Sequence, residues 1–137
     1  MIEYRYNLNG IDETWLEGPF FVGWPNPPSP VTHLRILQAA DEQVVAVSDG
    51  RVVGFVTALT DRILTAYIPL LEVTPGFQGQ GIGTRLVQHL LERFDRLYAV
   101  DVLCDPDVIP FYERFGFQAS TGAVLRRYEH QAGWDDY

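Results

Sequence analysis

A glycine-rich stretch in the middle of the chain has the residue types and spacing of a phosphate site. Residues 69–84 read PLLEVTPGFQGQGIGT. The apolar run from Leu70 to Val73 predicts a strand, Pro75-Gly76 predicts a turn, and the following glycines open a helix. Unpaired N–H groups and the positive end of the helix dipole favour an anion there. The stretch therefore predicts a site for a phosphate or pyrophosphate group.

Two common phosphate loops do not fit this stretch. A Walker loop ends in Gly-Lys-Ser/Thr, and the chain contains no lysine. A dinucleotide fingerprint needs Gly-x-Gly-x-x-Gly, whereas these glycines stand at 79, 81 and 83. What remains is Gln78-x-x-Gly81-x-Gly83, preceded by Val73-x-Pro75. This pattern resembles the acetyl-CoA loop of the GNAT superfamily of N-acetyltransferases.

A later segment resembles the second signature of the same family, Asn-x-x-Ala-x-x-Leu-Tyr-x-x-x-Gly-Phe. Tyr112, Gly116 and Phe117 match it, while Asp105 replaces the usual asparagine and Val108 the usual alanine. Both departures fall on the coenzyme side of the family's site. The resemblance covers residues 63–117 most closely, and the order of the remaining elements fits it.

The resemblance implies one N-acetyltransferase domain over residues 1–137. Its fold is α/β (α+β), with a central mixed, mostly antiparallel sheet splayed between the two parallel central strands, and helices on both faces. Pro69 agrees with that splay, because proline donates no ladder hydrogen bond and suits a bulge or a point where strands part.

Periodicity and turn residues predict the individual elements. Ser29-Pro30 is expected to start a helix whose buried stripe is Val31, Leu34 and Leu37. Strands are predicted at 2–6, 43–47, 51–59, 63–73 and 97–104, and helices at 11–17, 30–40, 79–94 and 105–116. A hairpin turn is predicted at Ser48-Asp49-Gly50. The C-terminal part is expected to form a closing hairpin over 118–120 and 123–128, followed by a tail from His130 to Tyr137.

Composition narrows the class of protein. The chain has 137 residues, a formal net charge of −8 and ten basic residues, all arginine. Such acidity argues against a nucleic-acid partner and modestly favours a cationic acceptor such as an amine.

The single cysteine excludes an internal disulfide framework. There is no signal-peptide pattern and no apolar run near 18 residues, so we expect a cytoplasmic protein without a membrane partner. A homodimer is left open.

The resemblance implies where the coenzyme is held. The backbone of Leu71 and Val73 would pair with pantetheine as a pseudo-strand, and a free N–H near Leu71 would stabilise an oxyanion. The expected acetyl-CoA-binding residues are Leu71, Glu72, Val73, Gln78, Gly79, Gln80, Gly81, Ile82, Gly83, Thr84 and Asp105.

The same resemblance supplies the catalytic candidates. Tyr112 is the expected general acid for the leaving thiolate, against the alternative of a core aromatic. Glu72 leads as general base because it is the carboxylate within the strand before the loop, with Asp101 and Asp105 as alternatives. The histidines show no metal or triad spacing, so no metal is expected.

Aromatic residues on a proline-rich segment, Phe20, Phe21 and Trp24, are expected either to wall an acceptor pocket or to pack onto the core.

Three functions are compatible with these candidate residues. The favoured one is transfer of an acetyl group from acetyl-CoA to a small primary amine, by direct attack in a ternary complex. The others are acetylation of a protein N-terminus or lysine, and non-catalytic binding of acyl-CoA.

Overall fold

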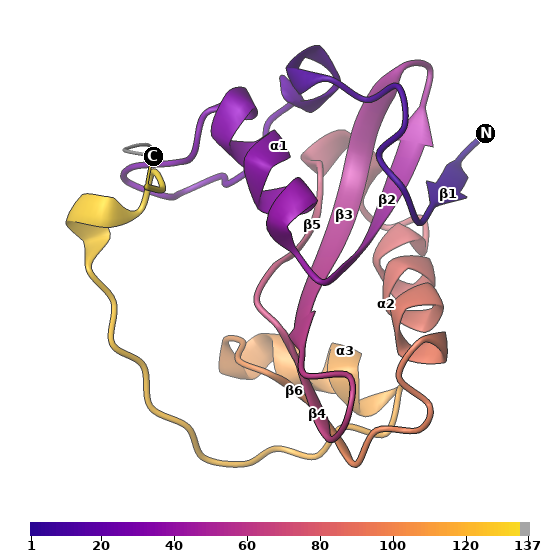
Figure 1. Cartoon of the computed structure of the whole chain (residues 1–137), viewed down its shortest axis with the longest axis vertical. Helices are drawn as coiled ribbons and strands as arrows, with labels where there is room; N and C mark the ends of the chain where they lie inside the picture. The colour runs from indigo at the N-terminus through magenta and orange to yellow at the C-terminus, as the bar shows by residue number, and fades with distance from the viewer. Residues whose placement is uncertain (135–137) are drawn as a thin grey trace.

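A mixed sheet runs through the middle of the molecule, with helices against both of its faces (Figure 1). The computed structural model describes residues 1–134, so the last three residues of the predicted tail lie outside it. The strands are β1 (Glu3–Arg5), β2 (Glu42–Ser48), β3 (Arg51–Thr60), β4 (Thr65–Ile68), β5 (Leu71–Val73) and β6 (Ala99–Val102). The α-helices are α1 (Pro30–Ala39), α2 (Ile82–Glu92) and α3 (Ile109–Glu113). Short 3-10 turns are η1 (Glu13–Leu16), η2 (Pro75–Phe77), η3 (Pro106–Val108) and η4 (Tyr128–His130).

The structure confirms two predicted element boundaries, the start of α1 and the turn between β2 and β3, and shows the physical cause of each. The Ser29 hydroxyl accepts a hydrogen bond from the Thr32 N–H at 3.2 Å and caps α1, which begins at Pro30. Asp49 and Gly50 have φ values of 49° and 71°, as a tight two-residue hairpin turn between β2 and β3 requires.

The strand predicted over 63–73 is two strands, separated at Pro69 and Leu70. The sheet order is β1-β2-β3-β4-β6, with β5 paired to β3 off this path. β4 pairs with the end of β3 and runs parallel to β6, whereas β5 pairs antiparallel with the middle of β3. Pro69 therefore marks the place where the sheet splays, as predicted.

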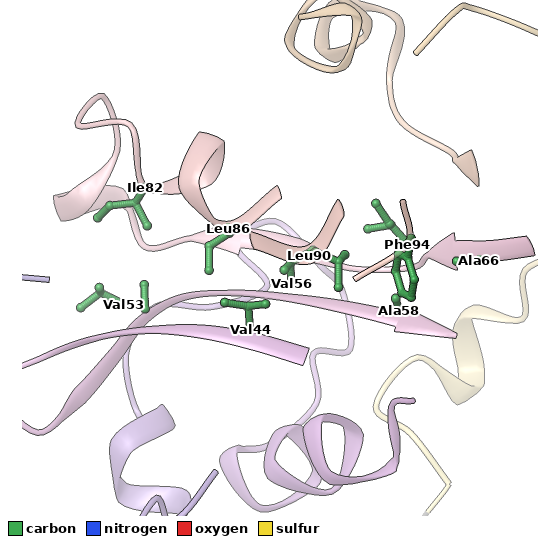
Figure 2. Packing of buried hydrophobic residues seen from close by; sticks show 11 residues of the cluster. Val44, Val53, Val56, Ala58, Ala66, Ile82, Leu86, Leu90 and Phe94 are labelled. Carbon is green, nitrogen blue, oxygen red and sulfur yellow. The ribbon is translucent and has the colours of Figure 1, made fainter. Parts of the chain in front are cut away.

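Apolar residues fill both faces of the sheet, because β2 and β3 alternate their side chains between them. On one face α2 lies along the sheet, and Figure 2 shows Leu86 and Leu90 of α2 above Val44 and Val56. On the other face, α1 and η1 cover a second cluster centred on Phe55 and Leu37. Because β2 and β3 are buried on both faces, their sequences are nearly continuous apolar runs.

The closing hairpin predicted over 118–120 and 123–128 is wrong. Residues 118–127 form no strand and are all exposed, and η4 occupies Tyr128–His130. Figure 1 shows this segment as a long arc, orange to gold, that stands away from the sheet and ends at η4. Alternation and β-branched residues favour a strand, but a strand also needs a neighbouring edge, and here the chain does not fold back onto one.

The predicted buried stripe of α1 is wrong at one position. Val31 is exposed, whereas Leu37 is fully buried and Leu34 is half-buried. His33, one turn before Leu37, takes the inward position and is only 1% exposed. Ring contacts with Phe20, Phe21 and Phe55 account for its burial, and the three-residue spacing did not reveal them.

Candidate active site

The outer edge of β5 carries backbone groups that bond no neighbouring strand, although the Val73 carbonyl accepts from the Gln78 side chain. The Thr57 N–H donates to the Leu70 carbonyl at 3.0 Å, and the Thr74 N–H donates to the Val53 carbonyl at 2.9 Å. In an antiparallel pair, alternate residues bond the same neighbour, so Leu71 and Val73 direct their N–H and C=O groups away from β3. No second strand pairs with β5 in residues 1–134. An extended ligand could therefore add to this edge.

The loop after β5 brings the start of α2 beside that edge. Gln78 donates from Nε2 to the Val73 carbonyl at 3.0 Å, which holds the loop against the strand. Gly79 and Gly81 have φ values of 79° and 83°, in the left-handed region that favours glycine. No side chain caps α2 at Gly81, so its first N–H groups have no side-chain acceptor.

Helix α3 closes this region from another side, through contacts that the sequence did not indicate. Arg114 donates from Nη2 to the Thr84 hydroxyl at 2.6 Å, joining α3 to the first turn of α2. A Cβ atom at Gly83 would stand 3.7 Å from the Phe111 ring and 3.8 Å from a Val73 methyl group. The end of β5, the start of α2 and α3 therefore meet at one point.

The residues of the loop differ in what they can offer a ligand. Gly79, Gln80 and Gly81 are exposed, and a Cβ atom at either glycine would meet nothing within 4 Å. The Ile82 side chain is buried in the core, which leaves its backbone as the available group. The stretch thus offers backbone donors over open space, a suitable arrangement for an anion.

Tyr112 of α3 lines a cavity of about 820 Å³ beside β6. Its side chain is 5% exposed and packs between the rings of Phe111 and Phe117. Burial raises the pKa of Tyr112 to about 12, and the nearby Cys104 sulfur adds to the rise. The phenol consequently keeps its proton throughout the neutral range and can act as a hydrogen-bond donor.

Glu72 lies on the opposite face of the sheet from Leu71 and Val73, as strand alternation predicts. Its Oε1 accepts a hydrogen bond from the Phe21 N–H at 2.8 Å. Burial raises the pKa of Glu72, and the hydrogen bond from Phe21 opposes that rise. A half-buried carboxyl of this kind is a better proton acceptor at neutral pH than an exposed one.

The aromatic residues of the N-terminal loop pack together over Phe55. Phe21 is 3% exposed and contacts the rings of Trp24, His33 and Phe55. Phe20 is half-buried and also contacts His33 and Phe55. These contacts match the packing alternative, while the bond from Phe21 to Glu72 connects the same loop to β5.

Of the remaining candidates, Asp101 lines the same cavity as Tyr112. Asp105 precedes η3 and makes no side-chain capping bond, and both Asp105 and Asp101 are exposed. Among residues 1–134, no cluster of three or more His, Cys, Asp and Glu side chains could hold a metal ion. Over the same residues, every helix is too short or too polar to cross a membrane.

Comparison with known proteins agrees with this architecture. Residues 13–117 match the acetyltransferase (GNAT) family model. The crystal structure of a protein from Deinococcus radiodurans R1, provisionally described as an acetyltransferase, is 48% identical with a TM-score of 0.94, covering 98% of this chain and 94% of that one. The GNAT family protein SP0256 from Streptococcus pneumoniae TIGR4 is 24% identical, with a TM-score of 0.74 and coverage of 93% and 98%.

Curated sequences give the same family at lower coverage. Histone acetyltransferase TAP1 from Glycine max is 31% identical over 120 residues, which are 75% of this chain and 50% of that protein. The chain spans about half the length of the curated relatives it matches, from 41% to 58% for the first three. The family match covers well over half of the chain, and it agrees with the splayed sheet, the uncapped glycine loop and Tyr112. This chain belongs to the GNAT acetyltransferase family.

Proposed function

We propose that this chain moves an acetyl group from acetyl-CoA to a primary amine, with both substrates bound at once. The observation that carries the proposal is the meeting of the free β5 edge with the uncapped start of α2. Pantetheine amides would pair with Leu71 and Val73 as an added strand, and the pyrophosphate would lie over Gly79 and Gly81. Open space at both glycines leaves room for that approach.

Two groups are proposed to stabilise the negative charge that develops on the substrates during acetyl transfer. The Leu71 N–H at the free edge would donate to a carbonyl oxygen as charge develops there. Tyr112 would donate its proton towards a leaving thiolate. Because its pKa is about 12 and that of an ordinary thiol is about 8.5, complete proton transfer is uphill. A hydrogen bond from Tyr112 to the sulfur therefore accounts for most of its contribution.

Glu72 is the proposed proton acceptor for the ammonium form of the amine. Its carboxylate lies on the α1 face, whereas the Leu71 and Val73 side chains pack on the α2 face. A bound water is therefore proposed to relay the proton to Glu72. The raised pKa of Glu72 supports this role.

A small amine is the favoured acceptor. The net charge of −8 attracts cations, and the half-buried Phe20 and Trp24 would supply an apolar wall in the loop that the Phe21 N–H ties to Glu72. A protein N-terminus or lysine is the second candidate, because TAP1 of Glycine max carries the name of a histone acetyltransferase. No nucleic-acid or metal partner is invoked.

Ligand-induced stabilisation tests coenzyme binding. Acetyl-CoA at a hundredfold excess over its Kd is expected to stabilise the fold by about 2.7 kcal/mol. For a chain of this length, that corresponds to a rise in Tm of about 9 °C, from about 2.1 cal/mol/K of unfolding entropy per residue. An unchanged Tm at millimolar acetyl-CoA would overturn the proposal.

An acceptor panel separates the two acceptor classes. Small amines and peptides with free N-termini or lysines are incubated with acetyl-CoA, and release of the CoA thiol is measured. Because the chain has no lysine, acetylation of its own lysines cannot add to the background. Turnover with amines but not with peptides supports the small acceptor; turnover with peptides alone supports the second candidate; binding without turnover leaves a coenzyme-binding module.

A further inference from the structure

Phe21 has an unusual backbone conformation for a large residue. Its φ is 58°, in the left-handed region that non-glycine residues seldom adopt and that is strained for a bulky side chain. Among residues 1–134, two other non-glycine residues share it, Asp49 and Arg62, and both lie in short turns between strands. Strain of this kind persists only where the surrounding structure holds it, and it is frequent at functional sites.

Ring packing and a turn hold Phe21 in this conformation. Its side chain is 3% exposed and contacts the rings of Trp24, His33 and Phe55. Its carbonyl accepts a hydrogen bond from the Trp24 N–H at 3.1 Å, which closes a turn. Gly23, inside that turn, has a φ of 87°, which glycine adopts without strain. The backbone at Phe21 is thus fixed both by its ring and by the turn that follows it.

This conformation sets the direction of one N–H group. The Phe21 N–H donates to Glu72 Oε1 at 2.8 Å, and no other group of residues 1–134 forms a hydrogen bond with the Glu72 side chain. Glu72 lies directly opposite Phe55 in the ladder between β3 and β5, so both side chains lie on the α1 face of the sheet. Because a glutamate side chain is flexible, a fixed donor restricts it to the orientations that reach that donor.

The same N–H stabilises the charge of this carboxyl group. Burial raises the pKa of Glu72 and the bond from Phe21 lowers it, while no charged side chain of residues 1–134 is a further cause. His33 is the titratable group that α1 brings to the same cluster, and burial lowers its pKa to about 4, so it is uncharged at neutral pH. Glu13 and Glu17 of the N-terminal segment are exposed. Within the described chain, the charge of Glu72 therefore depends mainly on the loop.

We propose that Phe21 is a positioning residue for Glu72. Its N–H, directed by the left-handed backbone, holds the carboxylate in the orientation that accepts the proton of the amine. The ring of Phe21 fixes that N–H and does not contact the amine, which accounts for its burial beside the half-buried Phe20 and Trp24. The loop that would wall the acceptor thus also controls the proton acceptor. This inference rests on the proposed function for the role of Glu72, but not for the effect of Phe21 on Glu72.

Replacing one backbone N–H by an ester oxygen tests this role without changing a side chain. An ester between Phe20 and Phe21 removes the bond to Glu72. An ester between Val22 and Gly23 is the matched control, because neither the Gly23 N–H nor the Val22 carbonyl has a partner in residues 1–134. NMR of isotope-labelled glutamate carboxyl groups, assigned with Glu72→Gln, gives the pKa of Glu72. We expect it to rise by about one unit in the Phe21 ester and to stay unchanged in the Gly23 ester.

The pH dependence of turnover connects this pKa to the reaction. The acid limb of kcat/KM should move to higher pH by the same amount in the Phe21 ester and should not move in the Gly23 ester. The KM for acetyl-CoA should stay unchanged in both, whereas a role of Phe21 in packing alone would leave the acid limb in place.

Three results would overturn the inference: an unchanged pKa of Glu72 in the Phe21 ester, an equal shift in both esters, or a shifted pKa with an unmoved acid limb. A parent that acetylates no amine would refute the proposed function instead. In that case the NMR titration, which needs no turnover, still decides whether Phe21 positions Glu72.

Discussion

Acid sensitivity of the fold is expected to come from His33, which is buried among aromatic rings. Burial lowers the pKa of His33 from 6.5 to about 4. The folded state therefore binds the proton more weakly than the unfolded state, and stability falls as the pH drops from 6.5 towards 4. At pH 5.0 this one group costs about 2 kcal/mol relative to pH 7.5, since one pH unit corresponds to about 1.4 kcal/mol. The corresponding loss in Tm is about 7 °C.

The variant His33→Phe removes the titrating group and keeps a ring beside Phe20, Phe21 and Phe55. Thermal or urea unfolding at pH 7.5 and 5.0 gives the loss for each protein, so any packing change in the variant cancels. We expect the variant to lose about 2 kcal/mol less than the parent over this range. His130→Gln, at an exposed position, is the control and should keep the parent's pH dependence. Equal losses in parent and His33→Phe would refute the assignment.

Three further substitutions test the site and its support. Tyr112→Phe should retain acetyl-CoA affinity and lower kcat by about tenfold to a hundredfold, since a hydrogen bond to a charged group contributes about 1.5–3 kcal/mol; a rate within about twofold of the parent would remove Tyr112 from the mechanism. Glu72→Gln should be more stable than the parent at pH 8, because a buried charge is removed while the amide oxygen can still accept from Phe21. This stability difference should vanish at acid pH, where Glu72 is protonated, and thermal melts measure it. The kcat of the variant should fall in a rate assay. Gly54→Val should destabilise the fold by about 1–3 kcal/mol, because even a Cβ atom would stand 3.2 Å from the Glu72 carbonyl and from a Leu86 methyl group; an unchanged denaturation midpoint would show that β5 and α2 can shift freely.

Local chemistry made part of this fold predictable. The cap at Ser29, the hairpin turn at Asp49-Gly50 and the break at Pro69 each depend on a backbone requirement that few residue types meet. The glycine loop was predictable for the same reason, since Gly79 and Gly81 adopt positive φ and lie before a helix. Features of this kind are encoded within a few residues of one another.

Long-range placement was not predictable from one sequence. The bond from Phe21 to Glu72 joins residues 51 positions apart, and that from Arg114 to Thr84 joins residues 30 apart. The burial of His33 depends on rings from Phe20, Phe21 and Phe55, which its own helix does not supply. The failure at residues 118–128 has a related cause: a strand pattern shows that a segment can pair, but it does not supply the neighbouring edge.

Strand β3 joins two parts of the sheet that are otherwise separate along the splay. Its middle, Gly54 to Val56, pairs with β5, and its end, Leu59 and Thr60, pairs with β4. The pair β4 and β6 is therefore attached to the rest of the sheet by a ladder of two residues, beyond the last residue that pairs with β2.

This attachment makes the end of β3 a hinge. A change in backbone angles at Ala58 and Leu59 that widened or narrowed the gap between β5 and β6 would also shift Ala66 and Ile68 within the apolar cluster under α2, so that packing limits the motion to a small range. A ligand that contacts both β5 and β6 would hold the two strands at a fixed separation. The relative motion of the two halves of the molecule would then slow when the gap is filled, and the amides of the paired residues Leu59 and Tyr67 would report it.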